Sequence, residues 1–245
     1  MSSDTIPLIE ALIHRLIDTH VKSVCVGAFI TAVISDHCGL SSTLREPCRE
    51  DVMPGVRDAG SLCGIKVKAL AEYVRSKNQL EASIGMAAIN SALPVPTIGI
   101  ISRNASDLIL QRGKNRRVAV IGHFPFVSSL EQITEKLMVF EKRIREGDIA
   151  SERIPELLPE ADVVAMSGTT LINHTFEDIR RYIRKDAYVI MLGPSTPLTP
   201  LVFKHGVDAL SGTIVVDEEA LLAGVSQGAT FRQLKGKDLV VLSRR

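Results

Sequence analysis

The feature that most constrains the fold of this 245-residue chain is the alternation of short apolar runs with helical segments after residue 117. Such runs are typical of strands buried on both faces of a parallel sheet. We expect strands at residues 118–122, 138–141, 163–167, 188–193, 213–217 and 239–242, with helices at 128–136, 176–185, 198–205 and 218–225. This alternation predicts an α/β fold with a Rossmann-like doubly wound, mostly parallel sheet. Capping-box spacings, Ser128 with Glu131 and Thr175 with Asp178, support two of the helix starts.

The residues before 96 follow a different order, in which one helix is followed by a pair of strands and then by two more helices. The expected elements are an amphipathic helix at 5–19, a strand hairpin at 22–36, an irregular connection at 37–64, and helices at 65–75 and 80–93. Pro94 and Pro96 end the last helix, because proline lacks the amide hydrogen that a helix needs. We therefore expect a small α+β domain at 1–95 and a Rossmann-like domain with a lead-in helix at 96–245.

Composition and charge exclude several classes of protein. A chain with 45% hydrophobic and 23% charged residues is a folded protein rather than a disordered one. Its 29 basic and 28 acidic residues nearly cancel, so no global field recruits nucleic acid or an anionic membrane. The uncharged stretch 82–102 contains Pro94 and Pro96 and does not fit a membrane span. Asp4 and Glu10 stand where an export signal needs basic residues, so we expect a cytoplasmic protein.

The four cysteines, Cys25, Cys38, Cys48 and Cys63, are expected to be free thiols. They show no C-x-x-C pairing, and disulfides are rare in a reducing compartment. A zinc site formed by Cys38, Cys48 and Cys63 with His37 is the alternative, but these spacings match no known ligand pattern.

Candidate site residues follow the first expected strand of the parallel sheet. In such sheets, ligands bind beyond the carboxyl ends of the strands. Gly122, His123, Phe124 and Pro125 stand at that point. Gly122 permits close backbone approach, Pro125 stiffens the turn, and His123 can change its charge near neutral pH. Because the turn lacks the G-x-G-x-x-G pattern, a dinucleotide such as NAD is disfavoured.

Glu141 ends the next expected strand, 19 residues after Gly122. Rossmann proteins place there an acid that accepts hydrogen bonds from ribose hydroxyls, so Glu141 is a candidate for holding a nucleoside-like ligand. A surface acid paired with Lys142 or Arg143 is an equally good interpretation.

Two segments rich in hydroxyl groups follow later strands. For the first, at 167–175, a ligand-binding loop is favoured over a turn whose hydroxyls bond their own backbone. The second, at 193–200, has three prolines that either preorganise its hydroxyls for binding or stiffen a crossover. Neither Ser167 nor Ser195 lies in a G-x-S-x-G pattern, so a serine hydrolase triad is disfavoured. Asp217 is expected to cap the last helix, with ligand binding as the alternative.

The order and spacing of these motifs resemble a known family. The residues that carry the resemblance are 120–125, 167–175 and 193–197, followed by Gly206, Gly212 and Asp217. They are similar to the uncharacterised family described as "putative heavy-metal chelation", whose Rossmann-like part follows a domain similar to the amino-terminal domain of enolase. Residues 84–90 look like the corresponding helix of that first domain.

The resemblance implies a cleft between the two domains. Thr31, Thr43 and Asn90 from the first domain would line it together with the loops named above. The role proposed for the family is condensation or hydrolysis of flavin-, pterin- or metallophore-like molecules. Its link to metals concerns a chelating product or pathway, and this sequence identifies neither a metal cage nor a cofactor.

The working hypothesis is an enzyme that binds a small polar heterocyclic or anionic ligand in this cleft. His123 acts as acid or base, Glu141 orients the ligand or a water, and the hydroxyl-rich segments donate hydrogen bonds to an anionic or carbonyl group. The expected ligand-binding residues are Gly122, Phe124, Pro125, Ser167, Gly168, Thr169, Thr170, Asn173, Gly193, Pro194, Ser195, Thr196, Asp217, Thr31, Thr43 and Asn90. The alternatives are a non-catalytic protein that binds or delivers a metal or metal complex, and a scaffold whose loops form contacts in a homodimer.

Overall fold

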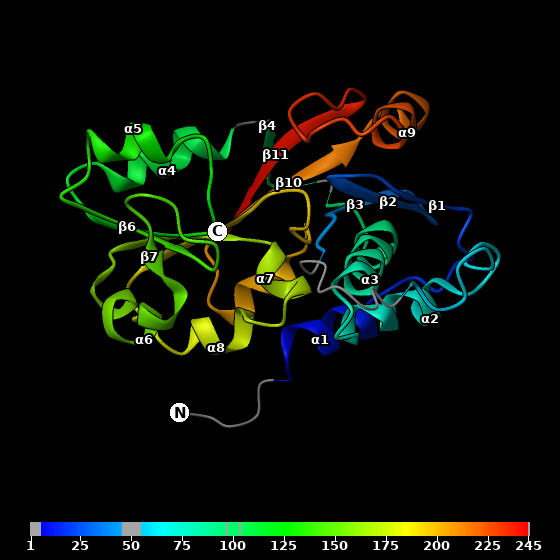
Figure 1. The fold of residues 1–245 in the computed structure, drawn as a ribbon, viewed down its shortest axis with the longest axis horizontal. Helices are drawn as coiled ribbons and strands as arrows, with labels where there is room; N and C mark the ends of the chain where they lie inside the picture. Colours follow the sequence, from blue (N-terminus) through cyan, green and yellow to red (C-terminus); the bar gives the residue numbers. More distant parts are fainter. Residues whose placement is uncertain (1–5, 46–54, 97, 103, 245) are drawn as a thin grey trace.

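The chain folds around two separate sheets. A computed structural model describes residues 6–45, 55–96, 98–102 and 104–244. It contains a three-stranded antiparallel sheet and an eight-stranded, mostly parallel sheet, and the three-stranded sheet lies beside the β10–β11 end of the larger one (Figure 1). The mixed α/β class and the doubly wound, mostly parallel sheet that the sequence predicts are confirmed.

The three-stranded sheet is formed by β1 (Ser23–Val26), β2 (Ile30–Ile34) and β3 (Cys38–Ser42). β1 and β2 form the expected hairpin. The expectation of an irregular connection from residue 37 was wrong, because β3 lies in it. β3 carries little β propensity in its Gly39 and serines. It is a strand because it packs on a helix so closely that a Cβ at Gly39 would lie 2.1 Å from the Ser91 nitrogen.

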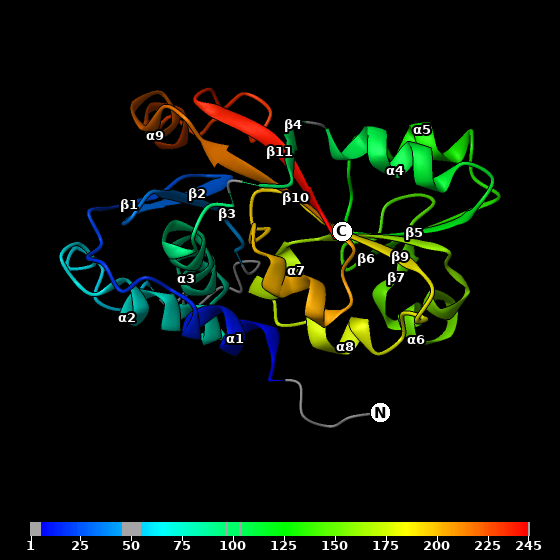
Figure 2. The same cartoon turned by 180° about the vertical axis from the view of Figure 1, so that it is seen from behind.

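Helices cover both faces of the three-stranded sheet (Figure 1 and Figure 2). On one face lies α3 (Gln79–Ala92), which is buried on almost all sides, with α1 (Leu8–His14), α2 (Val67–Ala71) and η1 (Glu72–Arg75) beyond it. On the other face lies α9 (Glu218–Ser226), whose Leu221 and Val225 pack against Ile30, Ala32 and Leu40. The last third of the chain therefore contributes to the core of the first.

The eight-stranded sheet has the strand order β4-β11-β10-β9-β8-β5-β6-β7. β5 through β10 are parallel to one another, and β11 is antiparallel to its neighbours β10 and β4. The strands are β4 (Ile100–Ser102), β5 (Arg117–Ile121), β6 (Lys136–Glu141), β7 (Ile149–Ala150), β8 (Val163–Ser167), β9 (Tyr188–Leu192), β10 (Ala209–Val215) and β11 (Lys237–Ser243).

The direction of the winding reverses between β5 and β8. From β5 the chain proceeds through β6 to β7 on one side, then returns to β8 and proceeds through β9 to β10 on the other. Ligands of open α/β sheets bind in the crevice outside the carboxyl ends of the strands at such a reversal. A ligand site is therefore expected at the carboxyl ends of β5 and β8.

Successive side chains of the central strands point to opposite faces of the sheet and pack in two apolar layers. Val118 and Val120 of β5 pack under α4 (Ala105–Gly113) and α5 (Val127–Glu131). Ala119 and Ile121 face the opposite layer. The helical segments of that layer are η2 (Ser151–Arg153), α6 (Ile154–Leu157), η3 (Leu158–Glu160), α7 (Thr169–Ile172), α8 (Phe176–Arg180) and η4 (Pro200–His205). This burial on both faces explains the continuous apolar runs of the strands.

Both capping-box predictions were wrong. Ser128 lies inside α5, whose N-cap position is Phe126. Thr175 does precede α8, but its hydroxyl donates to Asn173 Oδ1 at 2.6 Å and makes no cap bond. The segments expected to be helices at 128–136, 176–185 and 198–205 contain shorter helices, and the last is a 3₁₀ helix. Among the described residues, no helix combines the length and apolar character needed to cross a membrane.

Candidate functional site

A cleft of about 980 Å³ opens at the point where the winding reverses. Ile121 and Gly122 line it from the end of β5, Glu141 from the end of β6, and Ser167 from the end of β8. Gly122 has a φ of +100°, and a Cβ there would lie 3.2 Å from the Cβ of Ser167. Glycine therefore allows the chain to turn away from β5 while it stays close to the end of β8.

The opposite wall of the cleft is formed by residues in and next to the three-stranded sheet and by the start of α3. Ala28 from the β1–β2 turn, Thr43 and Leu44 after β3, and Gln79 at the start of α3 line it. Thr43 Oγ1 lies 2.9 Å from Thr31 Oγ1, and Thr31 is fully buried. Of the two threonines that the resemblance assigns to a cleft, Thr43 lines this one, whereas Thr31 is buried behind Thr43.

Hydroxyl and amide groups form one side of the cleft. The contributing residues are Ser167, Thr169, Thr170, Asn173 and Thr175. Their hydroxyls are also bonded within the segment: Thr169 donates to Ser167 Oγ and Thr170 to the Ser167 carbonyl, both at 2.8 Å. Part of this segment is α7 rather than a loop. Gly168 does not line the cleft; a Cβ there would lie 2.8 Å from the Thr196 nitrogen, so Gly168 lets α7 pack on the next turn.

The floor of the cleft is apolar. Besides Ile121, the described residues that form it are Phe140, Ile154, Pro155, Ile179 and Tyr182. Most of these side chains belong to the layer of α6 and α8 below the sheet. An apolar floor under a polar rim accommodates the flat face of a ring and orients its polar edge. The sequence analysis did not identify Tyr182, which is 39% exposed beyond the end of α8.

Charged side chains stand at the rim. Lys142 and Arg143 follow Glu141 directly, and Arg45 faces them from the other wall. Within the described part of the chain, none of these three cations forms an ion pair. The acids at the rim are Glu141, Glu152 and Asp178, the last of which pairs with Arg181 at 3.2 Å. The predicted pairing of Glu141 with Lys142 or Arg143 side chains is absent; Glu141 Oε2 instead accepts the Lys142 backbone N–H at 3.1 Å.

His123 lies next to the cleft without lining it. Its Nδ1 is 3.7 Å from Oδ1 of Asp148, whose side chain is only 4% exposed. The other oxygen of Asp148 accepts the Arg145 N–H at 2.9 Å, which fixes the carboxylate in the β6–β7 loop. Phe124 stacks on Phe126 with ring centroids 5.2 Å apart. Neither Phe124 nor Pro125 lines the cleft.

The turn after β9 separates the large cleft from a second hollow. Gly193 has a φ of +106°, and Ser195 Oγ accepts the Ser42 N–H of β3 at 2.9 Å. Ser195 is 1% exposed, so it joins the two sheets rather than facing a ligand. This contact closes part of the space that the resemblance assigns to one cleft.

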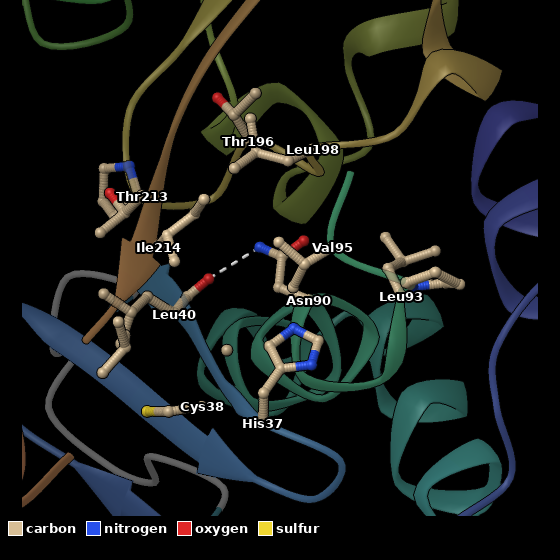
Figure 3. Close-up of a pocket in the computed structure, with 14 residues that line it drawn as sticks. His37, Cys38, Leu40, Asn90, Leu93, Val95, Thr196, Leu198, Thr213 and Ile214 are labelled. Carbon is tan, nitrogen blue, oxygen red and sulfur yellow. Dashed lines mark hydrogen bonds between the residues drawn. The ribbon is translucent and has the colours of Figure 1, made fainter. Parts of the chain in front are cut away.

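Pro194, Thr196 and Asn90 line the second hollow, which measures about 70 Å³ (Figure 3). Asn90 Nδ2 donates to the Leu40 carbonyl of β3 at 2.8 Å. In Figure 3, Asn90 lies between Leu40 and Val95, while Thr196 lies with Leu198 on the far side of the hollow. These three predicted ligand-binding residues therefore do not meet Gly122, Glu141 and Ser167 in the large cleft.

Neither Asp217 nor any cysteine within the described residues lines the large cleft. Asp217 Oδ1 accepts the Ala220 N–H at 3.0 Å and caps α9, the structural role that the sequence favours. Burial, together with Glu218 and Cys25, raises the pKa of the Cys38 thiol to about 12. Cys63 is exposed, and Cys48 lies outside the described residues. Among the described residues, no three His, Cys, Asp or Glu side chains gather as a metal site.

Known proteins share this architecture. A crystal structure of a protein with unknown function from Desulfitobacterium hafniense superimposes with a TM-score of 0.84 and 27% identity, over 97% of this chain and 98% of that chain. A protein with unknown function from Pyrococcus horikoshii has the same fold, with a TM-score of 0.79 and 20% identity over 97% and 98% of the two chains.

Relatives in sequence agree. An uncharacterized protein from Methanocaldococcus jannaschii is 26% identical over 179 residues, which cover 69% of each chain. Family models described as "putative heavy-metal chelation" match residues 9–93 and 104–242. The chain therefore belongs to the family described as "putative heavy-metal chelation".

Proposed function

We propose that this protein is an enzyme that acts on a small, polar, heterocyclic and anionic ligand in the cleft at the ends of β5, β6 and β8. The observation that carries the proposal is that one cleft combines an apolar floor with two rim cations, Lys142 and Arg143, that have no ion-pair partner in the described chain. The floor accepts the face of a ring, and the cations bind an anionic substituent. Flavin-, pterin- or metallophore-like molecules have this form, and condensation or hydrolysis is the reaction class.

His123 is the proposed acid or base. Asp148 lies 3.7 Å from Nδ1 and orients the ring, so Nε2 remains to exchange a proton with the ligand. His123 directly follows Gly122, which lines the cleft, so a ligand that extends past Gly122 comes within its reach. Glu141 orients the ligand or a water, and the hydroxyls of Ser167 and Thr169 contact its polar edge.

A His123→Ala variant tests the catalytic role. The small molecule that copurifies with the protein is first identified by mass spectrometry, and its turnover is then measured. We expect His123→Ala to reduce turnover by about a hundredfold or more, since general acid–base catalysis contributes that much. His14→Ala, a change on the exposed side of α1, is the matched control and should leave turnover unchanged. Full turnover by His123→Ala would remove this residue from the mechanism.

The second candidate is a non-catalytic protein that binds or delivers a metal complex, which the family description favours. Metal analysis of the purified protein separates the two candidates. Stoichiometric metal that disappears in both His123→Ala and Glu141→Gln supports binding and delivery. A metal-free protein that still turns over the identified ligand supports the enzyme.

A further inference from the structure

We propose that Glu141 makes the large cleft a receptor for a vicinal diol, and that the ligand is a ribonucleoside or a ribonucleoside monophosphate. The inference rests on the proposed function in that it places the ligand in this cleft. It assigns the ring and its polar substituent to a nucleobase and a ribose, in place of the flavin-, pterin- or metallophore-like classes named above, and the family description specifies none of these.

Glu141 lies at the carboxyl end of β6, next to the end of β5. β5 is the central strand from which the winding runs both ways, and β6 lies parallel beside it. The register pairs Ile121 with Phe140, so Gly122 and Glu141 leave the sheet at the same level. In α/β sheets that bind nucleosides, the acid at the end of this neighbouring strand accepts hydrogen bonds from the ribose hydroxyls.

The Glu141 carboxylate can accept further hydrogen bonds. The Lys142 N–H occupies Oε2, and Oε1 has no partner among the described residues. Glu141 is half-buried and lines the cleft. An ionised carboxylate only accepts hydrogen bonds, so a ligand that displaces water from Glu141 must supply donors. Two adjacent hydroxyls supply such donors without adding charge, and hydrogen bonds to an ionised group are the stronger kind.

The first turn argues against a dinucleotide. A diphosphate in a Rossmann-like sheet lies on the amides of a helix that begins directly after the central strand. Here α5 begins at Val127, and the stacked rings of Phe124 and Phe126 occupy the turn before it. The cations of the cleft instead follow Glu141. This geometry fits a phosphate carried on or near the ribose, within reach of Lys142 and Arg143.

Ribityl chains of flavins and catechols of metallophores present the same diol chemistry. The strand position of Glu141 favours ribose over both, and the apolar floor at Ile154 and Pro155 accepts a nucleobase. The experiment must therefore compare all three sources of the diol.

The test measures binding by isothermal titration calorimetry on the full chain. The probes are adenosine, guanosine, their 5′-monophosphates, the 2′-deoxy forms of all four, riboflavin and catechol. We expect at least one ribonucleoside or ribonucleotide to bind. Its 2′-deoxy form should bind about ten- to a hundredfold more weakly, since a hydrogen bond to a charged group is worth that much. Glu141→Gln should weaken the ribose form by the same factor and remove the discrimination.

Glu135→Gln, which changes an exposed acid that does not line the cleft, is the matched control and should change neither affinity. Thermal unfolding verifies that Glu141→Gln is folded. Equal binding of ribose and deoxyribose forms, an unaffected Glu141→Gln variant, or preference for riboflavin or catechol would overturn the inference. So would the lack of any ribonucleoside binding. None of these results contradicts the proposed function if the copurified ligand still occupies the cleft. A copurified ligand bound elsewhere would contradict both the proposed function and the assignment of a ribose to Glu141.

Discussion

Asp162 carries the densest set of charged hydrogen bonds described in the protein. Its carboxylate accepts the backbone N–H of Arg117 at 2.9 Å and the guanidinium groups of Arg117 and Arg184 at 3.0 and 2.9 Å. These bonds join the start of β5 to the start of β8. The side-chain hydrogen bond with Arg117 is the main cause that holds the pKa of the Asp162 carboxyl well below its ordinary value.

Stability should depend on the ionisation of Asp162 in a definite direction. Because the pKa of Asp162 is lower in the folded than in the unfolded chain, its contribution is complete above the unfolded pKa of about 3.9 and is lost as the pH falls through the folded pKa. We expect Asp162→Asn to lower the free energy of unfolding by about 1–3 kcal/mol at pH 7. The difference from the parent should shrink below about pH 4.

Urea unfolding at pH 7 and pH 3 measures this difference. Asp186→Asn is the control, because Asp186 also pairs with Arg184 but is 75% exposed, and it should change stability little. An Asp162→Asn effect of the same size at both pH values would show that the carboxylate charge is not the cause.

At the scale of elements, the contact between α3 and η1 is set by one glycine. A Cβ on Gly85 would lie 2.0 Å from the Val74 nitrogen. In a helix interior, Gly→Ala normally stabilises by about 0.5–1 kcal/mol. Here we expect Gly85→Ala to destabilise the protein by about 1–3 kcal/mol, because the two backbones must separate.

Thermal or urea unfolding tests this sign. Gly55→Ala is the matched control, since a Cβ at Gly55 meets no atom within 4 Å. A stabilised Gly85→Ala variant would mean that α3 and η1 are not packed as described.

The elements that the sequence predicted best are those whose local and tertiary preferences agree. β5, β6, β8 and β9 lie within a residue or two of the predicted runs, because burial on both faces makes them uniformly apolar. β3 was missed because close approach to α3 requires Gly39 and serines, which weaken the β signal. β10 begins at Ala209 rather than 213, since Ser211 and Gly212 interrupt its apolar pattern.

At the scale of the whole molecule, the site depends on how the three-stranded sheet lies against the strand ends. The expected strands of the parallel sheet predict that Gly122, Glu141 and Ser167 lie at one edge, and in the structure all three line one cleft. The order of the sequence could not show that Ser195 accepts a hydrogen bond from Ser42. Thr196 and Asn90 line the smaller hollow and not the large cleft. That division is a tertiary property, because it joins residues 153 positions apart.

Some site residues had signals that the sequence analysis did not use. Lys142 and Arg143 directly follow Glu141 at a strand end, so their position predicts cations at the rim. Asp148 had no such signal, because only the folding of the β6–β7 loop brings it to His123. Tyr182 reaches the cleft from beyond α8, which the helix pattern does not reveal.

The rim cations should make ligand binding dependent on salt. We expect the double variant Lys142→Ala/Arg143→Ala to bind the copurified anionic ligand about tenfold more weakly than the parent and with a smaller dependence on ionic strength. Lys185→Ala, an exposed change after α8, is the control. Calorimetric titrations at low and high salt provide the measurement. An unchanged affinity in the double variant would contradict the assignment of the anion to this rim.

A crystal structure of the protein with its copurified ligand tests the proposed site most directly. We expect ligand density in the large cleft, on the floor at Phe140 and Ile154 and in contact with Glu141 and Lys142. Density in the small hollow at Asn90 and Thr196, or on a surface away from the carboxyl ends of β5, β6 and β8, would contradict it.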